Sequence, residues 1–438
     1  METCDVLVLG GGLSGISCCA ILQSEGVDCL LIEKDTSLGG LTSTRVASSF
    51  VFDSHGGHVF NTKNERVKEW VFSILPECKW QHSPRVAKIW YGGKLISYPF
   101  ELALSELSPE EATECIMGIF ERKGEEPKSF GEWLKWNFGE AIANKYLFPY
   151  NRKIWKRDLS KMSAHWVSRK MPMPSLKEVL YAALSQNASE KKMVHSTYYY
   201  PHEGGIGDFI SCITKTLKNV KLGLPLQSLE KQGDVWIVNG NIRAKKIVST
   251  IPIPALVNVV KTIPPKVNNC ISRLDWNSIT TILCEQKKGG EISWLYLPGD
   301  GLPAHRIVYQ GGLAKNNCPK GKFSATYEIT GIHSPEEIIK TFRNSKLPDE
   351  LRAIDVLDFE HTKYAYPVYH LTFLEDIKVI QEWLKTQGII SCGRFAEWKY
   401  LNMDDCIARA FDVSDNLLLK QTKKRFPYED RSGTFNNE

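Results

Sequence analysis

The stretch that decides the fold is Asp5-Val-Leu-Val-Leu9-Gly10-Gly-Gly-Leu-Ser-Gly15. Its apolar first half predicts a buried parallel strand, and the residues after Gly15 continue in an apolar helical pattern. In this setting Gly10 permits the tight turn, Gly12 lets the backbone approach a pyrophosphate, and Gly15 lets the helix pack on the strand. The negative diphosphate then lies at the helix N-terminus, where free N–H groups and the helix dipole favour it.

A carboxylate follows at the spacing that a ribose requires. A second strand is expected over residues 29–32, and it ends at Glu33, about twenty residues beyond the glycines. This carboxylate suits the two hydroxyls of a ribose. Strand, glycine turn, helix and acid together predict a dinucleotide-binding fold.

Two further segments favour FAD over NAD. Gly39-Gly40 resembles the second phosphate-side turn of FAD enzymes of the amine oxidase type, although Thr36 and Ser37 stand where an arginine is usual. Residues 388–395 are expected to form a strand that ends in a turn at Gly393-Arg394. In such flavoproteins this returning segment covers the ribityl chain. FAD binding by a domain built from discontinuous segments follows.

A mixed α/β fold of three parts is expected. Capping residues at Ser108-Pro-Glu-Glu111 begin a helical region, and β-branched runs such as Thr280-Thr-Ile-Leu283 indicate strands. The parts are a Rossmann-like FAD-binding domain over 1–80, 200–255 and 385–438, a helical substrate-side subdomain over 101–199, and a mostly antiparallel sheet over 81–100 and 256–384.

The composition argues against several classes of protein. A formal net charge of +5 over 438 residues, without a Lys/Arg tract, does not argue for nucleic acid. The N-terminal residues lack a signal-peptide pattern, and no run approaches the roughly 18 apolar residues of a membrane span. The twelve cysteines are scattered without a C-x-x-C pair. We therefore expect reduced thiols, no metal site and a cytoplasmic protein.

A succession of motifs runs along the chain in a fixed order. Arg169 follows the third of these motifs, and Arg306, Tyr366 and Tyr400 come after the last. The motifs are Gly56-Gly-His-Val-Phe60, Tyr98-Pro-Phe100, Pro149-Tyr-Asn-Arg-Lys-Ile-Trp155 with Lys161-Met-Ser-Ala-His-Trp166, and Gly204-Gly-Ile-Gly207. Together they resemble the UDP-galactopyranose mutase family, nearer its eukaryotic branch, within the amine oxidase and protoporphyrinogen oxidase-like flavoproteins. The resemblance covers nearly the whole chain.

The resemblance implies a set of site residues. Catalytic roles fall to His58, Arg169 and Arg306, and no metal is expected. Cofactor contacts are Gly10, Gly12, Leu13, Ser14, Gly15, Glu33, Lys34, Gly40, Leu41, Gly57, His58, Gly393 and Arg394. Substrate contacts are Arg85, Tyr98, Phe100, Glu101, Asn151, Trp155, Arg169, Tyr296, Arg306, Tyr366 and Tyr400.

The resemblance also implies a mechanism. N5 of the flavin, reduced by NAD(P)H or another donor, attacks the anomeric carbon and displaces UDP. The resulting sugar–flavin adduct opens through an iminium, recloses as the five-membered ring and is captured again by UDP. Two arginines can hold the diphosphate by bidentate contacts that lysine would not reproduce. No protein nucleophile is needed, because the cofactor carries the difficult step.

Glu101 departs from the family pattern. After Tyr-Pro-Phe the family places an amide side chain, which both donates and accepts, whereas an ionised carboxylate only accepts. Such a carboxylate could take the uracil N3–H but would repel O4, and it could accept from the amine of cytosine. A preference for cytidine nucleotides, or for another sugar, is therefore one hypothesis. Alternatively, Glu101 points away or binds a neighbouring arginine.

Other functions remain open at this stage. An amine-oxidase-like or protoporphyrinogen-oxidase-like enzyme, with net redox chemistry, would carry the same N-terminal fingerprint. The pair Arg169 and Arg306, with its tyrosines, argues against a pocket for a cationic amine or an apolar substrate. A flavin-binding protein without catalysis is a third possibility. The expected partner is a nucleotide-diphosphate sugar, with a homo-oligomer possible.

Overall fold

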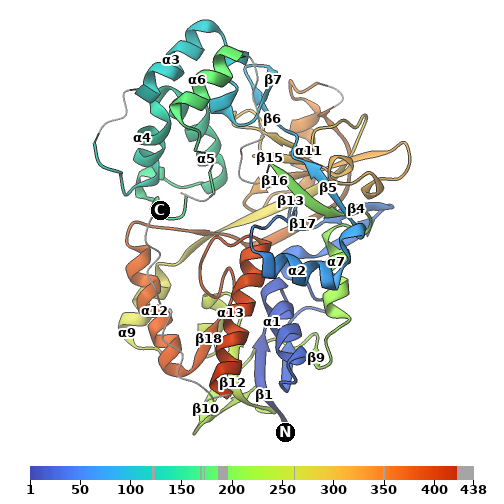
Figure 1. The fold of residues 1–438 in the computed structure, drawn as a ribbon, viewed down its shortest axis with the longest axis vertical. Coiled ribbons are helices and arrows are strands. Elements are labelled where there is room, and N and C mark those ends of the chain that lie inside the picture. Colours follow the sequence, from blue (N-terminus) through green and yellow to red (C-terminus); the bar gives the residue numbers. More distant parts are fainter. Residues whose placement is uncertain are drawn as a thin grey trace.

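The computed structural model describes residues 1–120, 124–167, 170–171, 173–185, 196–260, 262–348 and 351–421. The fold is mixed α/β. In Figure 1 the first sheet and its helices lie at one end of the molecule, and a group of helices with a second sheet beside it forms the other end. The twelve cysteines are free thiols, most of them buried. In the described segments no helix is both long and apolar enough to cross a bilayer.

The first sheet has the parallel centre that the N-terminal pattern predicts. Strands β2, β1, β12 and β18 run parallel, and β10 and β11 extend the sheet as antiparallel strands. The strands are β1 (Glu2–Leu9), β2 (Cys29–Ile32), β9 (Val220–Lys221), β10 (Leu229–Gln232), β11 (Val235–Val238), β12 (Ile242–Ser249) and β18 (Ile389–Ser391).

Helices cover both faces of this sheet, because β1 is apolar on both sides. Val6 and Val8 pack under α1, α2, α7 and α13, whereas Leu7 and Leu9 pack on the opposite face against α8, α9 and α12. Buried strands of this kind read as continuous apolar runs. The helices are α1 (Leu13–Ser24), α2 (Glu65–Ile74), α7 (Ile206–Thr214), α8 (Ile253–Val257), α9 (Pro265–Ser272), α12 (Phe373–Gln387) and α13 (Met403–Gln421).

The second sheet has the strand order β17-β13-β16-β15-β14-β6-β7. All neighbours in it are antiparallel except β14 and β6. Its strands are β6 (Ala87–Tyr91), β7 (Lys94–Ser97), β13 (Asp275–Gln286), β14 (Trp294–Tyr296), β15 (Arg306–Tyr309), β16 (Phe323–Thr330) and β17 (Ala353–Val368), with helices α10 (Gln310–Leu313) and α11 (Pro335–Arg343). Two two-stranded antiparallel sheets lie beside it. One pairs β3 (Thr44–Ala47) with β4 (Phe50–Asp53), and the other pairs β5 (Trp80–Pro84) with β8 (Thr197–Pro201).

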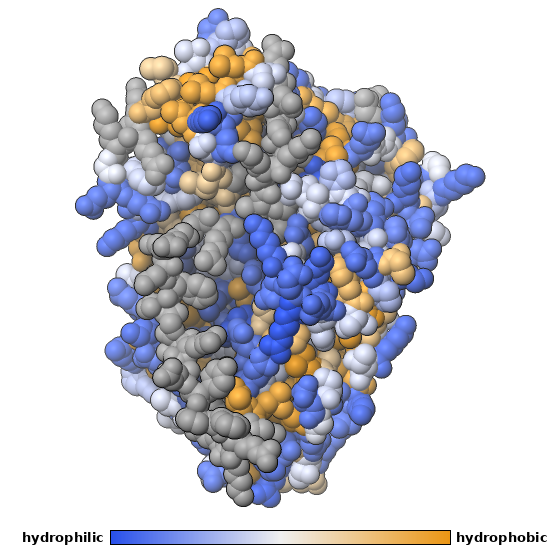
Figure 2. Space-filling view, viewed as in Figure 1, coloured by the Kyte–Doolittle hydropathy of each residue, from blue (hydrophilic) through white to orange (hydrophobic). Residues whose placement is uncertain are grey.

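The helical part contains α3 (Pro109–Phe120), α4 (Phe130–Ile142), α5 (Phe148–Trp155) and α6 (Leu176–Ser185). A π-helical turn, Ala143–Leu147, joins α4 to α5, and a 3₁₀ turn, Phe100–Leu102, leads into the helices from β7. Figure 2 shows apolar side chains gathered at this end of the molecule. The exposed large hydrophobic residues of α3 and α6 are Met117, Phe120, Tyr181 and Leu184.

Candidate cofactor and substrate site

The first glycine turn joins β1 to α1 and leaves the start of the helix open. Gly10 has a φ of +101°, and a Cβ on Gly15 would lie 2.0 Å from the carbonyl oxygen of Gly10. The helix can therefore pack this close to the strand only with glycine at position 15. A Cβ on Gly12 would meet nothing within 4 Å. Leu13 and Ser14, the first residues of α1, are buried.

The second glycine turn packs directly on the first. The Gly39 N–H donates to the carbonyl of Gly11 over 2.8 Å, and Gly12 and Gly39 form an isolated bridge. A Cβ on Gly40 would lie 3.0 Å from the Cα of Gly12. Leu41 follows in a 3₁₀ turn and is half-buried. Two segments that the sequence linked only by resemblance are thus in contact.

Glu33 lies beside these turns, at the carboxyl end of β2. Its Oε2 accepts from the Gly11 N–H over 2.5 Å, and its Oε1 accepts from the Asp35 N–H over 2.9 Å. Lys34 is exposed and pairs with Asp35 at 2.9 Å. The carboxylate is held at the edge of the glycine turns, where a ribose would reach it.

The returning segment closes the other side of α1. Gly393 has a φ of +99°, and a Cβ there would lie 2.2 Å from the Ser14 hydroxyl. The neighbouring Arg394 donates to two backbone carbonyls. Its guanidinium lies 5.2 Å from the ring centre of Tyr366 and 4.4 Å from that of Tyr400. The structure therefore brings Gly393-Arg394 to the first glycine turn and to two of the expected substrate tyrosines.

The segment around His58 contains a buried ring nitrogen with no hydrogen-bond partner among the described residues. Gly56 has a φ of +109°, and the Gly57 N–H donates to Glu328 Oε1 over 3.2 Å. His58 Nε2 is buried, and no hydrogen bond to it is present among the described residues. Burial, with Arg394 as the next cause, lowers the pKa of His58 to about 4. The imidazole is therefore neutral at physiological pH.

These residues fit a flavin dinucleotide. The open space at Gly12 suits a pyrophosphate at the helix N-terminus, and Glu33 is placed for a ribose. The unpartnered Nε2 of His58 suits a polar edge of the isoalloxazine ring. These residues, with Gly40 and Gly393, would hold FAD.

Arg306 is fixed by a buried carboxylate that the sequence analysis missed. Arg306 on β15 lies opposite Glu328 on β16. Its Nε and one terminal nitrogen donate to Glu328 Oε2 over 2.9 and 2.6 Å, and His305 Nε2 lies 3.6 Å from the same oxygen. Burial would raise the pKa of Glu328, but Arg306 and His305 outweigh it and lower that pKa to about 2. Glu328 is therefore ionised, and Arg306 remains cationic.

A sequence signal for Glu328 does exist. It is the one charged residue in the strand Phe323-Ser-Ala-Thr-Tyr-Glu-Ile-Thr330, which is otherwise apolar or uncharged and almost wholly buried. A buried charge requires a partner. That the partner is Arg306 depends on the pairing of β15 with β16, which the local pattern does not specify.

Aromatic rings and a guanidinium form a wall near Arg306. The rings of Tyr98 and Tyr296 stack with centres 4.7 Å apart, and Tyr150 meets Tyr296 edge-on at 5.5 Å. Arg85 donates to the Tyr296 hydroxyl and lies 5.3 Å from the centre of the Tyr98 ring. This wall can stack on a planar ring and also attract an anion.

Three other expected contacts are buried. Phe100 is fully buried and stacks on Tyr146 at 5.0 Å. Asn151 donates to a backbone carbonyl and accepts from Trp155 Nε1 over 3.2 Å, so it orients that indole. Trp155 is 3% exposed and packs on Trp166 at 4.9 Å. These side chains support the site from behind in this conformation.

The tyrosines converge on Arg306. Tyr366 and Tyr400 stack with ring centres 5.9 Å apart. The Arg306 guanidinium is close enough to Tyr366, Tyr296 and Tyr150 to interact electrostatically with each of them. A cation among phenol hydroxyls can bind the oxygens of a diphosphate without placing a nucleophile beside the sugar. Arg169, the second expected arginine, lies outside the described residues.

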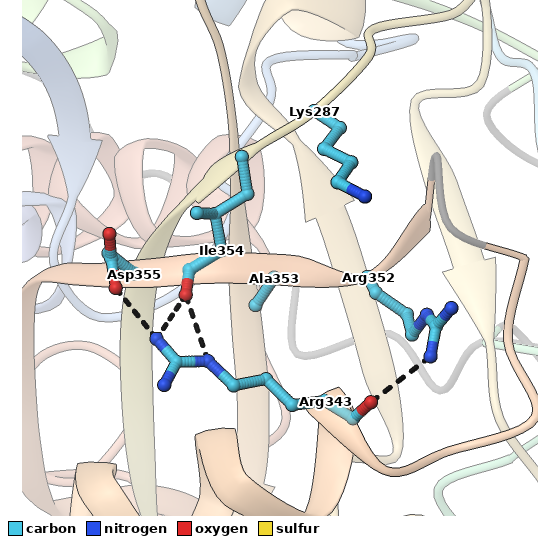
Figure 3. Close-up of a pocket in the computed structure, with 6 residues that line it drawn as sticks. All are labelled: Lys287, Arg343, Arg352, Ala353, Ile354 and Asp355. Carbon is cyan, nitrogen blue, oxygen red and sulfur yellow. Dashed lines mark hydrogen bonds and ion pairs between the residues drawn. The ribbon is translucent and has the colours of Figure 1, made fainter.

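A cavity of about 410 Å³ lies elsewhere, on the second sheet (Figure 3). Arg343 there donates to the carbonyl of Ile354 and to Asp355, and Arg352 donates to the carbonyl of Arg343. These arginines are thus engaged by their own neighbours. None of the expected site residues lines this cavity.

Comparisons with known proteins agree with this architecture. The family model for an NAD(P)-binding Rossmann-like domain matches residues 8–73. A UDP-galactopyranose mutase from Mycoplasma pneumoniae is 22% identical over 429 residues, covering 94% of this chain and 96% of the relative.

Solved structures extend the likeness to the whole fold. A crystal structure of reduced UDP-galactopyranose mutase matches with a TM-score of 0.87 at 21% identity, covering 96% of both chains. A putative protoporphyrinogen oxidase from Exiguobacterium sp. matches with a TM-score of 0.75 at 16% identity, covering 96% of this chain and 99% of the other. The resemblance to UDP-galactopyranose mutases and the expected mixed α/β fold are confirmed, and the expected nearness to the eukaryotic branch stays a prediction.

Proposed function

We propose that this chain, which resembles UDP-galactopyranose mutases along its whole length, is an FAD-dependent mutase. It would interconvert the pyranose and furanose forms of a nucleotide-diphosphate sugar, most simply UDP-galactose, without net redox change. The observation that carries this proposal is the setting of Arg306, a half-buried cation held by Glu328 among tyrosines.

On the substrate side, charged and uncharged side chains would have different roles. Arg306 would hold the diphosphate while it leaves the anomeric carbon and returns, because its outer edge is turned away from Glu328. Hydroxyls of Tyr296, Tyr366 and Tyr400 would add donors without adding charge. Arg169 would serve as the second arginine. The stacked pair Tyr98 and Tyr296 would face the nucleobase.

The cofactor side is built from different groups. Gly12 and the start of α1 would hold the FAD pyrophosphate, and Glu33 the adenosine ribose. His58, neutral at physiological pH, would hydrogen-bond to the flavin without adding a positive charge beside it. Once reduced by NAD(P)H or another donor, the flavin supplies the nucleophilic chemistry at the anomeric carbon.

A net redox reaction is the competing function. Its substrates in related folds include amines, and a cationic amine would be repelled by Arg85, Arg306 and Arg394. The two functions differ in stoichiometry. A mutase needs reduced flavin but consumes no reductant, whereas an oxidase reduces one flavin for each product formed.

The decisive experiment follows UDP-galactofuranose by chromatography with dithionite-reduced and with oxidised protein. Conversion to UDP-galactopyranose in the reduced sample alone supports the mutase. Arg306→Lys should lower turnover strongly, since lysine keeps the charge but loses the planar fork. Arg157→Lys is the matched control, because Arg157 pairs with Asp275 at the surface. Equal conversion by oxidised protein, or no conversion of any nucleotide sugar, would refute the proposal.

A further inference from the structure

We infer that Glu101 binds the hydrogen-bonding edge of the pyrimidine base as a neutral carboxylic acid. This role rests on the proposed function, because it takes the nucleotide to bind beside Tyr98. Glu101 belongs to the 3₁₀ turn Phe100–Leu102, three residues after Tyr98, and its side chain is 2% exposed.

Glu101 differs from every other buried acid in the described residues. Two of those acids, Asp376 and Glu397, pair with arginines, as Glu328 does. Asp53 accepts from the hydroxyls of Thr44 and Tyr200. The hydrogen bond that Glu101 has is with its own backbone N–H. A buried acid that lacks an external partner in the free protein is suited to find one in a ligand.

The surroundings of Glu101 contain no compensating cation among the described residues. Tyr146 is the titratable group that interacts with it. Charged groups on the elements packed against the turn are engaged elsewhere or, like Lys177 of α6, exposed. Lys94 of β7 donates to the Glu106 carbonyl, Glu106 accepts from Ser97, Lys135 of α4 pairs with Glu132 and Glu140, and Glu178 of α6 binds Ser175. Burial accordingly raises the pKa of Glu101 to about 7.

A neutral acid presents a donor and an acceptor side by side. Toward uracil, its O–H would donate to O4 while its carbonyl accepts from N3–H. Toward cytosine, the carbonyl would accept from the amine while the O–H donates to N3. The ionised form would turn a bare oxygen toward O4 of uracil or toward N3 of cytosine. The protonated protein would therefore bind both uracil and cytosine. The preference for cytidine nucleotides that was considered from the sequence does not follow from this arrangement.

The test is a calorimetric titration of UDP and of CDP into FAD-loaded protein between about pH 6 and about pH 8.5. Glu101→Gln is the reference, because its amide keeps one donor and one acceptor at every pH. Above the pKa of Glu101, wild-type affinity for both nucleotides should fall by up to about tenfold per pH unit relative to the variant. The ratio of the wild-type affinity to the Glu101→Gln affinity at each pH cancels the effect of phosphate ionisation, which is the same for both proteins.

A second measurement needs no variant. At about pH 8, UDP binding to the wild type in two buffers of different ionisation enthalpy should show uptake approaching one proton per site. Parallel pH profiles for wild type and Glu101→Gln, or binding without proton uptake, would overturn the role of Glu101 and leave the mutase proposal standing. Failure of both proteins to bind UDP and CDP at every pH would overturn the proposed function itself.

Discussion

Replacing Gly12 with alanine should separate cofactor binding from folding. Gly12 has φ −72° and ψ 175°, which alanine adopts without strain, and its Cβ would meet nothing within 4 Å. The apoprotein should therefore keep its stability or gain about 0.4–1 kcal/mol from the stiffer unfolded chain. The new methyl would occupy the space into which the FAD pyrophosphate is proposed to fit.

The expected loss of FAD follows from the hydrogen bonds that the phosphate would forfeit. Each hydrogen bond to a charged group contributes about 1.5–3 kcal/mol, so each one lost weakens FAD binding roughly ten- to a hundredfold. Gly15→Ala is the matched control. Its Cβ would lie 2.0 Å from the Gly10 carbonyl oxygen, so it should lose both stability and cofactor.

Two assays decide the matter. Flavin absorbance after purification gives the FAD content, and urea unfolding of the apoproteins gives their stability. If Gly12→Ala retains FAD with wild-type affinity, the pyrophosphate does not lie over Gly12. If its apoprotein is destabilised as much as that of Gly15→Ala, the space at Gly12 is not open and the reasoning fails.

Three further predictions concern buried charges. Glu328→Ala leaves the charge of Arg306 unpaired and should cost about 3 kcal/mol in urea unfolding, and a loss below about 1 kcal/mol would show that the pair is unimportant. Burial raises the pKa of Glu101 from 4.5 to about 7, so the folded protein keeps this proton up to a higher pH than the unfolded chain does. Stability should therefore fall by about 3 kcal/mol as pH rises through that window, and Glu101→Gln should abolish the fall. Burial lowers the pKa of Lys153 to about 7, so the contribution of Lys153 to stability changes with pH in the opposite direction. Between about pH 7 and 9, unfolding of the wild type should cost about 2–3 kcal/mol more as pH rises, and a wild-type profile parallel to that of Lys153→Met would contradict this.

Those parts of the fold that depend on a few neighbouring residues could be predicted from the sequence. Gly10, Gly12 and Gly15 identified a strand, a turn and a helix, because backbone conformation and close approach are properties of a few neighbouring residues. The continuous apolar run at residues 5–9 likewise indicated a buried parallel strand. The place of Gly393-Arg394 beside the cofactor was expected only through resemblance to known flavoproteins, and its contact with Ser14 was not predicted, since nothing in either segment specifies the other.

Features that depend on distant pairing were not predictable. Glu328 lies opposite Arg306 because two strands pair in one register, and the sequence of either strand alone does not fix that register. Phe100 was expected to flank the base, but it is fully buried in the core, where Tyr146 stacks on it and Tyr91 meets it edge-on. Glu101 was recognised as unusual, yet its lack of a counter-charge became evident only once the surrounding helices were in place.

The sheet that carries the cofactor side has a consequence for biosynthesis. Strand β12 lies between β1 and β18, and α13 packs beside α1, so the first glycine turn is enclosed only when residues 389–421 are present. On a ribosome, the turn emerges first and its last neighbours emerge hundreds of residues later. Flavin loading is therefore expected only after β18 and α13 have been synthesised, and a nascent chain stalled before β18 would expose an incomplete sheet to chaperones.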